Sequence, residues 1–124
     1  MMKVTPKGSN DGKNLRVKGE NELIRMIDSE YVMKAEEIYE WEDRFYLCLE
    51  YMDGKDLSRI ITDYHEHYSE EFIKYSIWCA AKGLDAMHDF GILHRDIKSD
   101  NFVCKSTGEI KLADLGLSVC LTKD

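Results

Sequence analysis

The spacing of hydrophobic positions changes along the chain, and each change marks the boundary of a predicted element. In the first half, apolar and polar residues alternate in short runs, which is the pattern of half-buried strands. The strands predicted from these runs cover residues 1–5, 31–33, 37–39 and 45–49. A helix over residues 15–27 interrupts them, because Leu23, Met26 and Ile27 share one face at the helical period.

In the second half of the chain, the spacing of apolar residues predicts helices followed by a hairpin. After a short helix near residues 58–64, the longest element runs over residues 69–90, with Ser69 as the capping residue and Gly91 at the exit. Its apolar residues recur at steps of four and three, which predicts a buried stripe. The stripe consists of Ile73, Ile77, Ala80, Leu84 and Met87. Beyond it, FVC and EIKLA flank KSTG as the two strands of a predicted β-hairpin.

Composition indicates one globular domain or part of one. The 124 residues are 44% hydrophobic and 33% charged. The net charge of -7 argues against nucleic acid or an anionic membrane surface as a partner, since both bind clustered positive charge. The chain has no run near the ~20 apolar residues of a membrane span and no signal core at its start. We therefore expect no membrane insertion and a cytoplasmic location, with the nucleus as the other option.

Cysteines and histidines do not predict a metal site in this chain. The four cysteines form no C-x-x-C pair, and we expect them to be small buried residues in a reducing compartment. They are Cys48, Cys79, Cys104 and Cys120. His65, His67 and His88 have no carboxylate or cysteine partner at ligand spacing.

The segment HRDIKSDN, residues 94–101, concentrates residues suited to phosphoryl transfer. That reaction needs a carboxylate to orient the attacking hydroxyl, ligands for Mg²⁺, and cations for the phosphate charge. Asp96 supplies the carboxylate, Lys98 a cation, and Asn101 an oxygen ligand for a hard metal ion. Asp114, in DLG, supplies a second metal carboxylate, and the fold-back of the predicted hairpin brings it toward Asn101.

These two motifs resemble those of the protein kinase family. The first matches H-R-D-x-K-x-x-N in full, and DLG stands at the D-F-G position. The matching residues are His94, Arg95, Asp96, Lys98, Asn101, Asp114, Leu115 and Gly116. The lysine two residues after Asp96 resembles the pattern of the serine/threonine kinases, and the segment as a whole resembles that of the STE group.

The resemblance implies a function and its site residues. It implies transfer of a phosphoryl group from ATP, with Mg²⁺, to a serine or threonine of a protein substrate. In this reading Asp96 is the catalytic base, Lys98 a cation beside the γ-phosphate, and Asn101 and Asp114 the magnesium ligands. Arg95 is similar to the arginine of kinases whose activation loop is ordered by phosphorylation.

The resemblance extends to the start of the chain. The family holds the α- and β-phosphates with a lysine on its third strand, paired with a glutamate on the following helix. Lys3 in MMKV stands at that lysine, and Glu22 in NEL is the better match to the helix glutamate. Glu20 is the competing partner, and an exposed terminal lysine is the other interpretation of Lys3.

Residues 47–57, LCLEYMDGKDL, resemble the hinge that binds adenine. The resemblance implies Leu49 as the gatekeeper, Glu50 and Met52 as backbone partners of adenine, and Asp56 near the ribose. It also implies Val103 beneath the adenine ring. An ordinary strand and turn is the alternative interpretation of this segment.

Three apolar or buried positions resemble members of the stack that links the two lobes of the family's fold. They are Met26, His94 and Leu115. We therefore expect a structural role for His94 rather than a catalytic one.

The fold implied by the resemblance is α+β and covers part of a protein kinase domain. Residues 1–52 would form the end of the small lobe, with antiparallel strands, the αC helix and the hinge, and residues 53–124 the start of the helical large lobe. Neither G-x-G-x-x-G nor A-P-E is present in the sequence. We therefore expect a fragment with an uncovered strand edge at Lys3, an exposed apolar patch on the long helix, low stability and little activity alone.

A second hypothesis is a binding module. A truncated kinase-like chain without catalysis would act by engaging a regulatory protein partner. The missing phosphate loop favours this hypothesis, whereas the intact chemical residues favour the enzyme.

Overall fold

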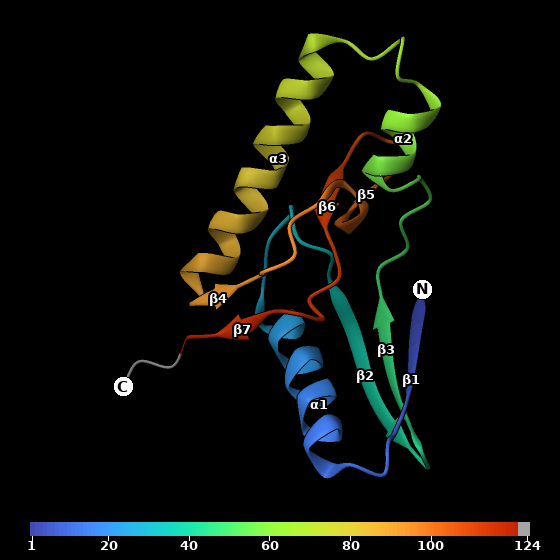
Figure 1. The fold of residues 1–124 in the computed structure, drawn as a ribbon, viewed down its shortest axis with the longest axis vertical. Helices are drawn as coiled ribbons and strands as arrows, with labels where there is room; N and C mark the ends of the chain where they lie inside the picture. Colours follow the sequence, from blue (N-terminus) through green and yellow to red (C-terminus); the bar gives the residue numbers. More distant parts are fainter. Residues whose placement is uncertain (122–124) are drawn as a thin grey trace.

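The computed structural model describes residues 1–121, which form a small antiparallel sheet with a helix against it and a second part built around a long helix (Figure 1). This is the predicted α+β arrangement. The elements are β1 (Met2–Pro6), α1 (Asp11–Met26), β2 (Ala35–Trp41), β3 (Arg44–Leu49), α2 (Leu57–Asp63), α3 (Glu70–Asp89), β4 (Ile92–Leu93), η1 (Ser99–Asn101), β5 (Phe102–Cys104), β6 (Ile110–Leu112) and β7 (Val119–Cys120).

The first sheet has the order β1-β3-β2, and both pairings are antiparallel. Lys3 and Ile38 both pair with Leu47, so β3 lies in the centre and β1 forms one edge. The strand that carries Lys3 is therefore a sheet edge, as predicted. The strand predicted at residues 31–33 is wrong, because Val32 makes a single bridge instead of joining a ladder.

Helix α1 begins earlier than its apolar pattern predicts. Asn10 caps it by accepting a hydrogen bond from the Gly12 N–H, so the helix includes residues that look like a loop in sequence. Its core face matches the prediction at Ile27, which is buried, and at Leu23, which packs against the core, but not at Met26. Ile24 is buried, whereas Met26 is 56% exposed, so Met26 is not a member of the buried stack.

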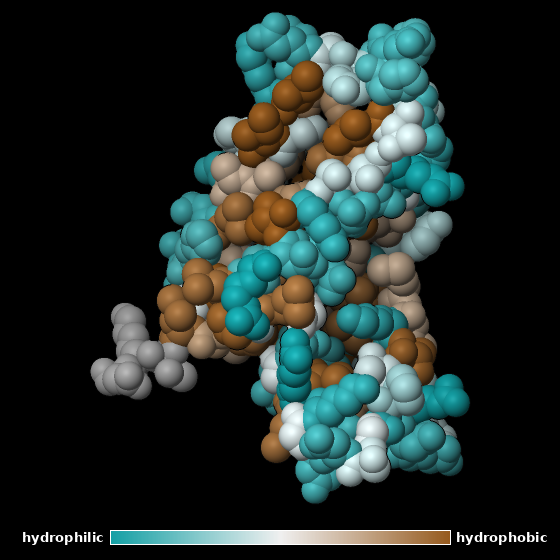
Figure 2. Space-filling model, in the orientation of Figure 1, coloured by the Kyte–Doolittle hydropathy of each residue, from teal (hydrophilic) through white to brown (hydrophobic). Residues whose placement is uncertain are grey.

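Helix α3 has the predicted cap, since Ser69 accepts a hydrogen bond from the Phe72 N–H. The predicted stripe is corrected at its start, because Ile73 and Ile77 are exposed and Ile77 is 65% accessible. The buried positions of the helix are Ser76, Cys79, Gly83 and Met87. Figure 2 shows hydrophobic side chains on the surface over α3, in agreement with the predicted apolar patch.

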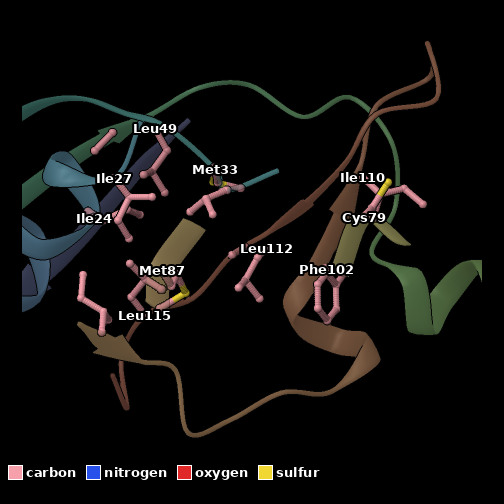
Figure 3. Close-up of a cluster of buried hydrophobic side chains, with 14 of the residues drawn as sticks. Ile24, Ile27, Met33, Leu49, Cys79, Met87, Phe102, Ile110, Leu112 and Leu115 are labelled. Carbon is pink, nitrogen blue, oxygen red and sulfur yellow. The ribbon is translucent and has the colours of Figure 1, made fainter. Parts of the chain in front are cut away.

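The core joins the two parts of the chain at Leu112, whose side chain is fully buried. The Leu112 N–H donates to the Tyr31 carbonyl at 2.7 Å, and the Met33 N–H donates to the Leu112 carbonyl at 2.8 Å. Figure 3 shows Leu112 within the cluster that also contains Met33 and Met87. The segment after α1 is therefore fixed to β6 through the backbone.

Two of the four cysteines differ from the prediction. Cys79 and Cys104 are buried as expected, but Cys48 is partly exposed and Cys120 is exposed. Burial raises the pKa of the Cys104 thiol to about 11, which keeps it protonated and unreactive at neutral pH.

Replacing Gly83 by alanine tests the contact between α3 and the rest of the core. A Cβ at this position would lie 2.9 Å from the Tyr31 carbonyl oxygen and 3.4 Å from the Leu112 Cβ. We expect Gly83→Ala to lower the free energy of unfolding by about 1–3 kcal/mol, measured by urea unfolding. Gly19→Ala in α1 is the matched control, since nothing lies within 4 Å of its new Cβ, and it should raise stability by up to ~1 kcal/mol. Equal stability of the two variants would contradict the packing.

Candidate active site

A cavity of about 460 Å³ lies between the first sheet, α1, the end of the HRDIKSDN segment and the DLG segment. Its apolar walls come from β3, β5 and the end of β6. They include Leu47, Leu49, Val103 and Ala113. Its polar lining includes Lys3, Glu20, Asn101 and Asp114. Five of the predicted site residues thus meet at one cavity, although the sequence separates the first from the last by most of the chain.

Six other predicted residues do not line this cavity. They are Glu22, Glu50, Met52, Asp56, Asp96 and Lys98. Asp96 and Lys98 belong to a loop beside it, whereas Glu22 faces a different groove with Lys18 and Tyr39.

Glu20, rather than Glu22, is the helix glutamate on the Lys3 side of α1. Burial raises the pKa of the Glu20 carboxyl, and the positive charges of Arg16 and Lys3 partly oppose this rise. Two residues along a helix turn the side chain to nearly the opposite face, so both glutamates cannot point into the cavity. Ile24, one turn after Glu20, lines the same cavity. The four-residue spacing between Glu20 and this apolar residue is the sequence signal that could have identified Glu20.

The loop around Asp96 is held by Asn101. The Asn101 Nδ2 donates to the Asp96 main-chain oxygen at 2.7 Å and to its carboxylate Oδ2 at 3.1 Å. The short helix η1 places Asn101 for this contact and buries it. Lys98 Nζ lies 3.5 Å from the same Oδ2. Asp96, Lys98 and Asn101 therefore form one connected group.

His94 joins this loop to the DLG segment. Its side chain is 2% exposed, its Nδ1 accepts the Asp96 N–H at 3.1 Å, and its Nε2 lies 3.2 Å from the Ala113 carbonyl oxygen. Because Nδ1 is the acceptor, the ring proton belongs on Nε2, which donates to Ala113. The histidine thus acts as a structural bridge between the two motifs.

The DLG segment is fixed by two arginines and by its own turn. The Asp114 Oδ1 accepts the Gly116 N–H at 3.1 Å. The carbonyl of Gly116 accepts a bond from Arg16 at 3.1 Å, and that of Leu117 accepts one from Arg95 at 2.7 Å. Asp114 and Arg95 both have positive φ, 52° and 66°, a strained conformation that occurs often at functional sites.

The side chains predicted for the hinge have other contacts. Asp56 caps α2 by accepting the Arg59 N–H at 2.8 Å, and its backbone bridges Val103. Met52 is partly buried and packs against the core. The carboxylate of Glu50 is bound by Lys111 at 2.9 Å. The expected adenine contacts of Glu50 and Met52 involve backbone atoms, so they stay predictions.

The donor set at the cavity fits a hard cation that also binds phosphate. Asn101 and Asp114 supply amide and carboxylate oxygens, the ligand types that Mg²⁺ prefers, and such sites usually have few protein ligands. Among residues 1–121 no cluster of three or more histidine, cysteine, aspartate or glutamate side chains is placed to hold a metal ion.

Comparison with known proteins gives the family. Residues 1–124 match the protein kinase domain family. Serine/threonine-protein kinase CBK1 of Pneumocystis carinii is 34% identical over 103 residues, which are 83% of this chain and 20% of that protein. Serine/threonine-protein kinase cot-1 of Neurospora crassa is 33% identical over 82% of this chain and 17% of its own length. Ribosomal protein S6 kinase alpha-1 of Homo sapiens is 33% identical over 84% of this chain and 14% of its own length.

The chain belongs to the protein kinase domain family, as its motifs predicted. These relatives are named as kinases, two of them as serine/threonine-protein kinases, and the chain spans a fifth or less of the length of each. The family generally uses ATP and Mg²⁺ and acts on protein substrates. None of the helices within residues 1–121 is both long enough and apolar enough to cross a bilayer.

Replacing His94 by alanine tests the bridge between the two motifs. The change leaves a cavity and removes the partners of the Asp96 N–H and the Ala113 carbonyl. We expect His94→Ala to lower the free energy of unfolding by about 2–4 kcal/mol, measured by thermal or urea unfolding. His88→Ala, at an exposed position of α3, is the control and should change stability by less than about 0.5 kcal/mol. A loss as small for His94 as for His88 would argue against the bridge.

Proposed function

We propose that this chain forms the nucleotide pocket and catalytic loop of a serine/threonine protein kinase, which transfers the γ-phosphoryl group of ATP to a protein hydroxyl. The observation that supports this most strongly is the convergence of Lys3, Asn101 and Asp114 on one cavity. These residues come from β1, η1 and the segment after β6, and a kinase needs all three types around a triphosphate.

The chain's own residues divide the work as follows. Lys3 holds the α- and β-phosphates, and Glu20 orients the lysine amine from α1. Asn101 and Asp114 would hold Mg²⁺, which neutralises phosphate charge and aligns the phosphoryl group. Val103 provides the apolar surface beneath adenine and Leu49 is the gatekeeper, with the backbone of Glu50 and Met52 at the edge of the ring and Asp56 toward the ribose.

Asp96 acts beside the pocket, on the acceptor side. Its carboxylate orients the substrate hydroxyl and accepts its proton, while Asn101 holds the carboxylate in place through the 3.1 Å hydrogen bond. Lys98, 3.5 Å from that carboxylate, brings a positive charge next to the transferred phosphoryl group. The non-catalytic binding module is less favoured, because every residue that this chemistry requires from the segment is present.

The assignment of Glu20 is tested by a pair of matched substitutions. Glu20→Gln should weaken binding of a non-hydrolysable ATP analogue about 10-fold, because the negative charge that acts on Lys3 from α1 is lost. Glu22→Gln removes the same charge from nearly the opposite face of α1 and should leave affinity unchanged, since Glu22 faces another groove. Isothermal titration calorimetry with Mg²⁺ measures both. Equal effects of the two changes would refute the assignment.

A second substitution separates catalysis from nucleotide binding. Asp96→Asn should reduce phosphotransfer to a protein substrate by about 10²–10⁴-fold, because the general base is removed. Affinity for the ATP analogue should stay within twofold of wild type, since Asp96 does not line the cavity. Phosphotransfer at the wild-type rate would rule out Asp96 as the base.

A further inference from the structure

The carboxylate of Glu50, directly after β3, binds three donors at once. Lys111 Nζ donates to both carboxylate oxygens at 2.9 Å, and the Lys34 N–H donates to Oε1 at 2.8 Å. Lys105 Nζ lies 3.5 Å from Oε2. The side chains of Glu50 and Lys111 are only 14% and 13% exposed, so solvent screens this cluster less than an ordinary surface ion pair.

The carboxylate stays ionised despite its burial. Burial alone would raise the pKa of Glu50, but the Lys34 amide, Lys111 and Lys105 together outweigh it and lower the pKa. A buried charge is retained in this way where its donors are held in place by the fold. In the proposed chemistry this carboxylate has no role, since its side chain does not line the cavity.

The partners of Glu50 lie on segments that form different walls of the cavity. Glu50 follows Leu49 on β3, and Lys111 on β6 precedes Ala113 and Asp114, and all three of these neighbours line the cavity. Lys34 is linked to Glu50 twice, because the Glu50 N–H also donates to the Lys34 carbonyl at 3.0 Å. The cluster therefore ties the end of β3, β6 and the segment before β2 together outside the lining of the cavity.

We propose that Glu50 is a positioning residue that fixes the separation of the two cavity walls by binding Lys111 and the Lys34 amide simultaneously. The nucleotide then meets a pocket whose walls are already in place, and binding does not have to order them. The nucleotide-binding measurements that test this proposal rest on the proposed function. The contacts of Glu50 with Lys111 and the Lys34 amide, called the clamp below, can be tested without any nucleotide.

Two single variants and their combination test the clamp. Glu50→Gln keeps an acceptor for the Lys34 amide but loses the charge, and Lys111→Met removes the ammonium while keeping the aliphatic stem. Each should weaken binding of the Mg²⁺-bound ATP analogue about 3- to 10-fold, and the double variant should be no weaker than the stronger single one. Ile110→Val, at a buried position of the same strand, is the control, which should lose stability without losing affinity.

The outcomes separate the clamp from the proposed function. Unchanged or tighter nucleotide binding in Glu50→Gln and Lys111→Met, or additive losses in the double variant, would overturn the positioning role. If the wild-type chain binds no nucleotide, the proposed function fails instead, and hydrogen exchange then decides the clamp. The Ala113 amide, bonded to the Asn101 carbonyl at 2.7 Å, should exchange about 10-fold faster in Glu50→Gln, and an unchanged rate would refute the clamp.

Discussion

The backbone pairing at Leu112 is the constraint on which the rest of the structure depends. Its two hydrogen bonds, to Tyr31 and from Met33, are the point where the segment after α1 meets the hairpin of the second part. Gly83 makes this junction possible, because α3 approaches the Tyr31 carbonyl too closely for a side chain. Since Asp114 follows Leu112 by two residues, the same pairing directs the DLG segment toward β1 and α1. The cavity exists because these walls share one anchor.

Around that anchor the functional groups are held in place by hydrogen bonds from neighbouring residues. His94 connects the backbone of the catalytic loop to Ala113, and Asn101 holds the Asp96 carboxylate through its amide. The positive φ of Asp114 persists within this network. A site of this kind is preorganised. Its groups are ordered when the chain folds, so binding does not carry the free-energy cost of ordering them.

Much of this arrangement follows from sequence, and the failures have a common cause. Sequence patterns predict the chemistry of the loop, the Ser69 cap and the hairpin, because each of these depends on residues that are close together in the chain. The choice of Glu20 over Glu22 depends on how α1 is rotated against the sheet, which tertiary packing decides. The exposed Ile77 on α3 has the same origin, since that helix turns its small residues inward to meet Tyr31 and Leu112. The spacing of apolar residues within a helix does not specify how α1 and α3 are rotated about their axes against the rest of the fold.

In the proposed site, segments far apart in the chain enclose one nucleotide. A crystal structure of the chain with Mg²⁺ and a non-hydrolysable ATP analogue tests it most directly. We expect the Lys3 amine on the phosphates, Asn101 and Asp114 on the metal ion, and adenine over Val103 and beside Leu49. A nucleotide bound elsewhere, or a Lys3 amine turned away from the phosphates while Asp114 binds the metal, would contradict it.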